Sequence, residues 1–265
     1  MDFIFLPYRI RRSLNLKLQG HEHYSTIHLE FSVKIDCEIK HAVKLAKRNF
    51  KISDGTALQN GIISAMEKWL EMTAGAKGVV FDFGGVIAYP PGDAWGAYRV
   101  AAELGLSRTA FDAAFKKYRY LWDGDFIDGI EMYRRIFAAN GLTASDADLK
   151  RLLDADCEGW VHKFNPTTLA LMQTLKAQGR KIGILTNMPT EFRDNWFMTY
   201  AAKYVAMADA TVVSGEHHLY KPEPEIYRLM EQQLALAPAD LFFFDDNQAN
   251  VDGAIRCGWR AALYR

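Results

Sequence analysis

One stretch decides the fold of this chain: Gly78-Val79-Val80-Phe81-Asp82-Phe83-Gly84-Gly85-Val86-Ile87. Its first half is an apolar run rich in Val and Phe, which is typical of a strand buried on both faces. The carboxylate of Asp82 interrupts this run, and burying a carboxylate without a partner is costly. We therefore expect Asp82 at the carboxyl end of the strand, the edge where open α/β sheets bind ligands. Gly84 and Gly85 allow a sharp turn there.

An Asp that ends an apolar strand also has less specific explanations. Taken alone, such a residue is as often a structural cap as a reactive group. Asp82-Phe83-Gly84 also matches the metal-binding triplet of protein kinases. The sequence lacks the glycine-rich loop, the strand lysine and the His-Arg-Asp loop that accompany this triplet in kinases. A functional role for Asp82 is supported only by the polar residues that follow later strands.

The composition is ordinary for a globular protein with a sizeable core. Of the 265 residues, 49% are hydrophobic and 24% are charged, and the net charge is zero, which indicates neither a nucleic-acid nor a membrane partner. No apolar run approaches the roughly 20 residues of a membrane span, and the apolar start Met1–Leu6 lacks the features of a signal peptide. Cys37, Cys157 and Cys257 are widely spaced. They favour a reducing compartment, so we predict a cytoplasmic protein.

Residues 1–75 differ from the rest of the chain. Between residues 27 and 39, apolar and polar residues alternate without a break, as in a half-buried strand. A helix is expected at Ala57–Met72. His21 and His23 would share a strand face, but no Cys or carboxylate cluster completes a metal site with them.

Residues 88–165 are predicted to be helical and to form a lid inserted between the first two strands. Helix caps and glycine stops predict helices at Ala94–Leu104, at Arg108–Tyr120, from Asp128 or Gly129 to Ala139, and from the cap Ser145 towards Trp160 or His162. The aromatic residues of this region are expected to serve mainly as packing between helices. Trp122 and Asp123 lie in a predicted turn and are the better candidates to contact a ligand.

From Asn165 to the end, helices and strands alternate. The expected strands are Lys181–Leu185, Ala210–Ser214, Leu241–Phe244 and Arg260–Tyr264, and the expected helices are Thr167–Gln178, Phe192–Val205, Pro224–Leu234 and Val251–Cys257. This alternation predicts an α/β fold with a doubly wound parallel sheet.

Three units follow from this organisation. Residues 76–87 and 166–265 would form the catalytic core, and residues 88–165 a helical cap. Residues 1–75 would be an N-terminal extension of open status. They are either a genuine accessory segment or an upstream part that precedes a true start at Met66 or Met72.

Four more chemically active residues stand near strand ends or helix starts: Thr186, Lys221, Asp245 and Asp246. The strands of a parallel sheet all end at one edge, so these residues can converge with Asp82 despite their separation in sequence. Three carboxylates suit Mg²⁺, which prefers hard oxygen ligands. A hydroxyl and a lysine suit the phosphoryl oxygens that the metal leaves free. Singly, each residue has a structural explanation; together they indicate phosphate chemistry.

These motifs resemble those of the haloacid dehalogenase superfamily, whose members are mostly phosphatases. The family's four motifs are matched in order and spacing by Phe81–Val86, Leu185–Asn187, Lys221-Pro222 and Phe244–Asn247. The resemblance covers about residue 77 to the end of the chain. The helical insertion is similar to that family's cap of the first type.

The resemblance implies a mechanism. Asp82 attacks phosphorus and forms an aspartyl phosphate, which water then hydrolyses. Thr186 and Lys221 stabilise the transferring phosphoryl group, and Asn187 helps to bind it. The implied Mg²⁺ ligands are the Asp82 carboxylate, the Gly84 backbone carbonyl and Asp246, with Asp245 close by.

One departure from the family concerns Gly84. Typical phosphatases of the family carry a second Asp at this position as general acid and base, a function worth about 10²–10⁴-fold in rate. Either water or the cap supplies the proton, with Asp123 and Asp125 as the first candidates, or the substrate has a good leaving group such as an anomeric sugar phosphate. Some family members with Gly here resemble sugar-phosphate phosphatases, and this chain resembles the glucose-1-phosphatase-like members.

Two alternatives to a phosphatase remain open. A haloacid dehalogenase also lacks the second Asp and would use Asp82 to attack carbon. Asp245 and Asp246 argue against it, because dehalogenases need no metal and paired carboxylates repel an anionic haloacid. A catalytically weak protein could use the fold for binding or regulation. The favoured function is a Mg²⁺-dependent phosphatase of a small phosphorylated metabolite, with the oligomeric state left open.

Overall fold

In the computed structural model, the backbone is described for residues 57–265 and the side chains for residues 64–265. The alternating stretch at residues 27–39, His21 and His23 lie outside the described residues, so the predictions made for them remain predictions.

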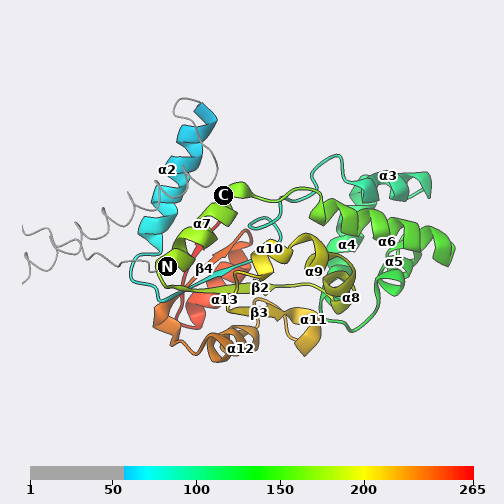
Figure 1. Cartoon of the computed structure of the whole chain (residues 1–265). Coiled ribbons are helices and arrows are strands. Elements are labelled where there is room, and N and C mark those ends of the chain that lie inside the picture. The colour runs from blue at the N-terminus through cyan, green and yellow to red at the C-terminus, as the bar shows by residue number, and fades with distance from the viewer. Residues whose placement is uncertain (1–56) are drawn as a thin grey trace, which may run out of the picture.

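The core is a five-stranded parallel sheet in the order β3-β2-β1-β4-β5 (Figure 1). Its strands are β1 (Gly78–Phe81), β2 (Lys181–Thr186), β3 (Ala210–Val213), β4 (Leu241–Asp245) and β5 (Arg260–Leu263). The strand expected to decide the fold is the central one, and Val79, Val80 and Phe81 have no exposed surface. The predicted α/β fold with a parallel sheet is confirmed.

Helices cover both faces of this sheet. Alternate residues of β1 enter different apolar clusters: Val79 and Phe81 pack with α2 and α7, and Val80 packs with α12 and α13. The four helices are α2 (Ala57–Met72), α7 (Pro166–Ala177), α12 (Pro224–Leu234) and α13 (Gln248–Arg256). Both faces of the central strand are therefore buried, which explains its continuous apolar sequence.

The second half of α2 is an integral part of the core. The Trp69 ring packs on Tyr264, with ring centroids 4.5 Å apart, and on Phe244 at 6.2 Å. Met66 and Leu70 are buried as well. The described core therefore begins upstream of residue 76, where the sequence analysis starts the catalytic core.

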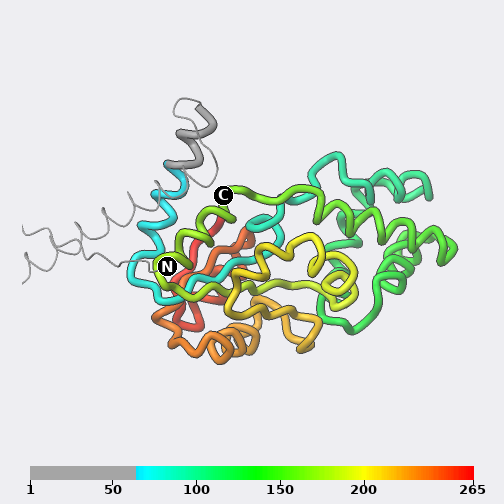
Figure 2. Tube along the Cα trace, in the orientation of Figure 1, coloured from blue at the N-terminus to red at the C-terminus, as the bar shows by residue number. Residues whose placement is uncertain are grey.

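Four helices are inserted between β1 and β2 and lie to one side of the sheet (Figures 1 and 2). They are α3 (Gly96–Glu103), α4 (Arg108–Asp123), α5 (Gly129–Ala138) and α6 (Asp146–Val161). As expected, side chains cap the starts of three of them: Ser107 accepts from Ala110, Asp128 from Glu131, and Ser145 from Asp148. The four helices predicted for this region are confirmed with small shifts at their ends.

The turn expected at Trp122–Asp125 is wrong in its first half. Helix α4 continues through Asp123, because Trp122 is buried and Arg119 pairs with Asp123 one helical turn later, at 2.7 Å. The chain turns only at Gly124.

The continuous helix expected at Phe192–Val205 is also wrong. This segment consists of α8 (Thr190–Phe192), a π-helical turn η1 (Arg193–Phe197), α9 (Met198–Tyr200) and α10 (Ala202–Val205). The buried rings of Phe192 and Phe197 both pack against Phe83, and π-helical turns occur frequently at functional sites. Two short elements were not expected: α11 (Ser214–His217) and the 3₁₀ turn η2 (Pro238–Asp240).

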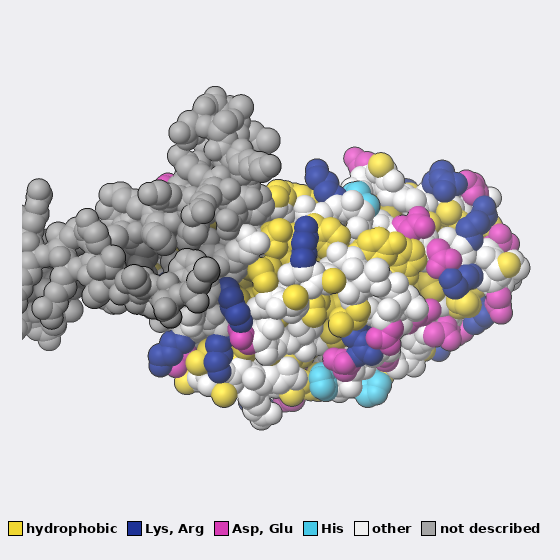
Figure 3. Space-filling view, viewed as in Figure 1, with side chains coloured by type: hydrophobic (Ala, Val, Ile, Leu, Met, Phe, Trp, Pro, Cys, Tyr) yellow, Lys and Arg dark blue, Asp and Glu magenta, His cyan; other side chains and the backbone are white. Residues whose placement is uncertain are grey.

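The described surface carries charges of both signs. Over the inserted helices, basic and acidic side chains are interspersed on the face shown in Figure 3, and several pair, as Arg134 does with Asp146 at 2.6 Å. Such a face produces no extended field of one sign. Among the described helices, none has the length and apolar character needed to cross a membrane. Cys157 and Cys257 are both free thiols.

Candidate active site

Asp82 lies at the carboxyl end of β1, as predicted. Its backbone N–H donates to the Phe244 carbonyl at 2.9 Å and continues the sheet ladder by one residue. Its side chain is 11% exposed. Asp82 Oδ1 accepts from the Phe83 N–H at 2.7 Å and lies 2.8 Å from the ammonium of Lys221. The carboxylate is therefore held at the rim of the sheet by a neighbouring amide and one cation.

Lys221 reaches Asp82 from the loop before α12 and is almost fully buried. Its Nζ also donates to Asp245 Oδ2 at 2.6 Å. Its backbone is clamped by the Asn187 side chain, which accepts from Lys221 N at 2.8 Å and donates to Lys221 O at 3.0 Å. Asn187, predicted to bind substrate, thus also fixes the lysine, which lies between two carboxylates.

The two acidic residues at the end of β4 differ in their surroundings. Asp245 is fully buried and accepts from Lys221, from Asn250 Nδ2 at 3.1 Å on each oxygen, and from Asn247 N at 2.8 Å. Asp246 is exposed, and no other described residue hydrogen-bonds its side chain. Donors on this chain thus already engage Asp245, whereas Asp246 keeps its oxygens free for another ligand.

Gly85 makes room for Asp246. Its φ is +74°, a conformation that L side chains rarely adopt. A Cβ at this position would lie 2.1 Å from Asp246 Oδ2. The turn after the first strand therefore depends on glycine for both its backbone geometry and its space.

The acidic cluster fits a divalent cation. Asp82, Asp245 and Asp246 each place one carboxylate oxygen within 4.8 Å of the others. With Lys221 as the neighbouring cation, the three carboxylates leave two net negative charges when all of them are ionised. Burial raises the pKa of Asp82 to about 8; Lys221 opposes this shift, and Asp245 and Asp246 add to it. A bound cation would favour the charged carboxylate, and oxygen ligands of this kind suit Mg²⁺.

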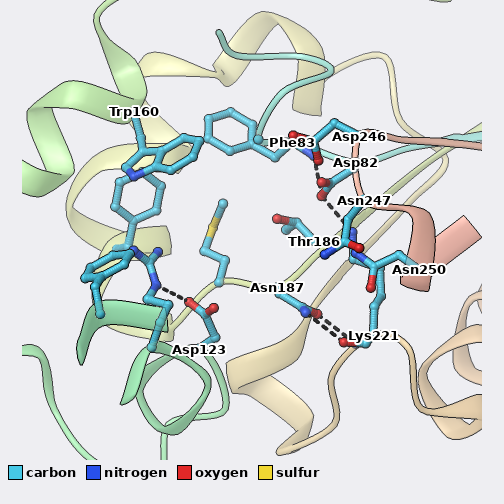
Figure 4. Close-up of a pocket in the computed structure, with 15 residues that line it drawn as sticks. Asp82, Phe83, Asp123, Trp160, Thr186, Asn187, Lys221, Asp246, Asn247 and Asn250 are labelled. Atoms are coloured by element: carbon cyan, nitrogen blue, oxygen red, sulfur yellow. Dashed lines mark hydrogen bonds and ion pairs between the residues drawn. The ribbon is translucent and has the colours of Figure 1, made fainter. Parts of the chain in front are cut away.

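A cavity of about 260 Å³ opens in front of these groups. Figure 4 shows Asp82, Thr186, Lys221 and Asp246 on one side of it and Trp160 and Asp123 on the other. The lining residues are Asp82, Phe83, Gly84, Phe115, Arg119, Asp123, Trp160, Thr186, Asn187, Met188, Phe192, Lys221, Asp246, Asn247 and Asn250. The core and the inserted helices thus build the cavity together.

The structure contradicts the expectation that Trp122 contacts a ligand. Its side chain is 1% exposed and does not line the cavity. The indole N–H donates to Glu191 Oε2 at 3.1 Å, and the guanidinium of Arg119 lies 4.6 Å from the ring centroid. Trp122 therefore packs the insertion against the core.

Asp123 does line the cavity, as expected, and is joined there by Arg119. The Arg119 Nε donates to Asp123 at 2.7 Å, and its Nη1 lies 3.6 Å from Asp156. Burial raises the pKa of Asp123, and Arg119 opposes the shift. Asp125 does not reach the cavity: it accepts from the N–H of Thr190 at 3.0 Å and from the Thr190 hydroxyl. Of the two carboxylates expected as proton donors, only Asp123 faces the site.

Two aromatic residues of the cavity were missed as site residues. Trp160 lies over Gly84, and a Cβ on Gly84 would meet the indole Cζ3 at 3.1 Å. Phe115 lies on α4 beside Arg119, whose guanidinium is 5.2 Å from its ring centroid. From the sequence, Trp160 is predicted to pack between helices, because helical spacing does not reveal which face of α6 meets the core.

A parallel sheet covered by helices on both faces, with an aspartate directly after the central strand, defines the class of Rossmannoid α/β proteins. A model of the haloacid dehalogenase-like hydrolases matches residues 76–258, so the chain belongs to this family. Over 145 residues the chain is 27% identical to flavin mononucleotide hydrolase 1 of Arabidopsis thaliana, a match that covers 54% of this chain and 56% of the relative. The chain thus spans just over half the length of that relative.

Solved structures share the fold. A haloacid dehalogenase family enzyme from Bacteroides thetaiotaomicron, solved with magnesium and inorganic phosphate, has a TM-score of 0.55 at 20% identity, covering 72% of this chain and 95% of the other. The L-2-haloacid dehalogenase of Xanthobacter autotrophicus, with chloropropionic acid covalently bound, has a TM-score of 0.54 at 20% identity, covering 71% and 77%. One neighbour was solved with phosphate and another is a haloacid dehalogenase, so the shared fold does not distinguish a phosphatase from a dehalogenase.

Proposed function

We propose that this protein is a Mg²⁺-dependent phosphatase that hydrolyses a small phosphate monoester at Asp82. The observation that carries the proposal is the charge of the site. Asp82, Asp245 and Asp246 outnumber their one neighbouring cation, Lys221. A site with this surplus of negative charge repels an anionic substrate unless a metal ion is bound.

The proposed roles follow from the surroundings of each residue. Asp82 is the nucleophile and forms an aspartyl phosphate, which water hydrolyses. Thr186, at the end of β2, and Lys221 hold the phosphoryl oxygens. Mg²⁺, when bound, neutralises charge between the nucleophile and the phosphate. Asp82, the Gly84 carbonyl and Asp246 are its proposed ligands, with Asp245 instead keeping Lys221 in place.

We further propose that α3–α6 act as a cap over this site. Support comes from the lining of the cavity, to which these helices contribute Phe115, Arg119, Asp123 and Trp160. The A. thaliana relative is named for the hydrolysis of flavin mononucleotide, which makes that ester one compound to test. The cytoplasmic location stays a prediction, and the oligomeric state stays open.

One assay separates this proposal from its alternatives. Purified protein is offered p-nitrophenyl phosphate or chloroacetate, with Mg²⁺ or with excess chelator. The expected result is phosphate release that needs Mg²⁺ and no chloride release. Chloride release that persists in chelator would instead establish a dehalogenase. If the protein turns over none of p-nitrophenyl phosphate, chloroacetate, flavin mononucleotide and glucose 1-phosphate, the result would favour a binding or regulatory protein.

A further inference from the structure

The indole of Trp160 contacts Gly84, which follows the candidate nucleophile Asp82 by two residues. A Cβ on Gly84 would lie 3.1 Å from Cζ3, 3.7 Å from Cε3 and 3.8 Å from Cη2 of this ring. These three atoms belong to the six-membered ring, which therefore covers Gly84, two residues from Asp82. Trp95 supports the indole edge to face, with ring centroids 6.4 Å apart, and is itself buried. A flat aromatic surface is thus held in place next to the site of phosphoryl transfer.

The same ring fills the space above Gly84. A carboxylate side chain at this position would extend beyond a Cβ that already contacts the indole. Asp123 also lines the cavity and does not belong to the acidic cluster, but its carboxylate accepts a hydrogen bond from Arg119. A leaving group that departs readily as an anion suits such a site. Phenols, which ionise with a pKa of about 10, leave far more easily than alcohols.

The remaining surface at this end of the cavity is largely apolar. It is formed by Phe83, Phe115, Met188 and Phe192. The polar side chains there are already paired, Arg119 with Asp123 and Asp156, and Asn187 with the Lys221 backbone. A leaving group rich in hydroxyls would lose hydrogen bonds to water without regaining them.

We infer that the phosphate ester accepted by this site carries a flat, uncharged aromatic leaving group, which stacks on the indole of Trp160. The inference rests on the proposed phosphatase function and adds its substrate class. The phosphate occupies the end of the cavity formed by Asp82, Thr186 and Lys221. The phenolic oxygen leaves with the electron pair of its bond to phosphorus as Asp82 attacks, and water protonates it in solution.

Binding of two phosphonates tests the inference without turnover. Phenylphosphonate and cyclohexylphosphonate are compared at a pH where both are dianions; each then carries the same charge and a six-membered ring, but only the first ring is flat and aromatic. Their dissociation constants are measured by calorimetry with Mg²⁺ present. Phenylphosphonate is expected to bind about three- to tenfold more tightly, the range that aromatic pairing provides. Equal binding, or tighter binding of the cyclohexyl compound, would overturn the inference.

Three variants locate the preference. Trp160→Leu should abolish the phenyl preference and leave the affinity for inorganic phosphate unchanged, whereas Trp160→Phe should keep most of the preference. Trp196→Leu is the matched control, because Trp196 stacks on Tyr200 outside this cavity. An unchanged preference in folded Trp160→Leu would refute the role of this ring. If Trp160→Leu does not fold, the comparison of the two phosphonates on the unaltered protein still decides.

Turnover separates this inference from the proposed function. Benzyl and cyclohexylmethyl phosphate have leaving groups of similar basicity, so their kcat/KM ratio reports ring recognition alone, and benzyl phosphate should be favoured. Phosphatase activity with no such preference, or with glucose 1-phosphate as the best ester, would overturn the substrate class but keep the phosphatase. If the protein neither binds inorganic phosphate nor hydrolyses any of these esters, the phosphatase function and the substrate class are both refuted.

Discussion

At the scale of single residues, the site depends on a balance of charge around Lys221. Its ammonium lies within 3 Å of both Asp82 and Asp245, and Asn187 and Asn250 hold the lysine and Asp245 in position. Burying two carboxylates is tolerable because each has a charged, hydrogen-bonded partner. Of the three carboxylates, Asp246 is the exposed one, and no other described residue donates a hydrogen bond to its side chain.

Replacing the candidate nucleophile should abolish turnover without unfolding the protein. In Asp82→Asn the amide is a poor nucleophile, and the metal loses a charged ligand. Burial raises the pKa of Asp82, so removing this charge does not deprive the fold of a favourable group. The measurements are kcat on p-nitrophenyl phosphate and the thermal unfolding midpoint. Activity above a few per cent in the purified variant would refute the assignment.

Removing the exposed carboxylate should weaken metal binding specifically. Asp246→Ala is expected to raise the Mg²⁺ concentration for half-maximal activity at least about tenfold, because even residues behind metal ligands affect affinity by 10–100-fold. Asp252→Ala is the control, since Asp252 lies on α13 and bonds Gln248. Full activity of Asp246→Ala in excess chelator would eliminate the metal from the mechanism.

The absence of an acid at Gly84 should make the rate depend strongly on the leaving group. kcat/KM is measured for esters of graded leaving-group pKa, and a steep decrease with rising pKa is expected. Gly84→Asp alone should be hindered by the indole above it, whereas Gly84→Asp combined with Trp160→Ala should flatten the dependence. A general acid is worth about 10²–10⁴-fold for the poorest leaving groups. A flat dependence in the unaltered protein, with chemistry rate-limiting, would point to Asp123.

At the scale of secondary-structure elements, α2 and the inserted helices differ in what holds them. The second half of α2 is anchored by aromatic packing of Trp69 on Tyr264. The end of α4 is attached to the core by polar contacts, such as Asp125 with Thr190 and His218 Nδ1 with the Gly124 carbonyl at 2.8 Å. The aromatic packing of α2 contributes mainly to the stability of the whole core, whereas the polar contacts at the end of α4 mainly fix the position of that helix.

Truncating the anchor of α2 should destabilise the whole core. Trp69→Ala is expected to lower the free energy of unfolding by about 3–5 kcal/mol, the usual cost of removing a large buried aromatic side chain. The measurement is urea-induced unfolding. Lys68→Ala, an exposed change on the same helix, should have little effect. Equal stability of both variants would show that α2 does not belong to the core, and a chain starting at Met72 would then fold normally.

Weakening the link between α4 and α8 should loosen the insertion locally. Thr190→Val removes the hydroxyl that donates to Asp125 and keeps the backbone N–H. Amide exchange of residues 124–129 should become about two- to tenfold faster, as expected for the loss of a hydrogen bond worth about 0.5–1.5 kcal/mol. Thr143→Val, in an exposed loop, is the control. Unchanged exchange in Thr190→Val would show that this contact does not hold the insertion.

At the scale of the whole molecule, two bodies of different chemistry meet at the cavity. The sheet contributes the charged groups, and the inserted helices contribute Phe115 and Trp160 together with the Arg119–Asp123 pair. Under the proposed function, the core would hold the phosphate, and the inserted helices would share recognition of the organic part with Phe83, Met188 and Phe192 of the core. Substitutions in the insertion should therefore change which ester is preferred more than whether phosphate is bound.

The sequence by itself determined the sheet and the convergence of its polar residues. Buried parallel strands need continuous apolar runs, and their carboxyl ends must share an edge. Asp82, Thr186, Asp245 and Asp246 stand at the ends of such strands and Lys221 stands before a helix, so their order along the chain implies that they lie together. Local caps such as Ser107, Asp128 and Ser145 likewise mark helix starts, because they act within one turn.

Only the tertiary structure decided which aromatic residue faces the cavity. Trp122 and Trp160 both lie near the ends of inserted helices, yet the first packs against Glu191 and the second covers Gly84. These contacts join residues about seventy positions apart and depend on how α4 and α6 pack against the core. Helical periodicity contains no information on this packing. The clamp of Asn187 on Lys221 and the packing of Trp69 on Tyr264 have the same origin, because each joins elements that meet only in the folded chain.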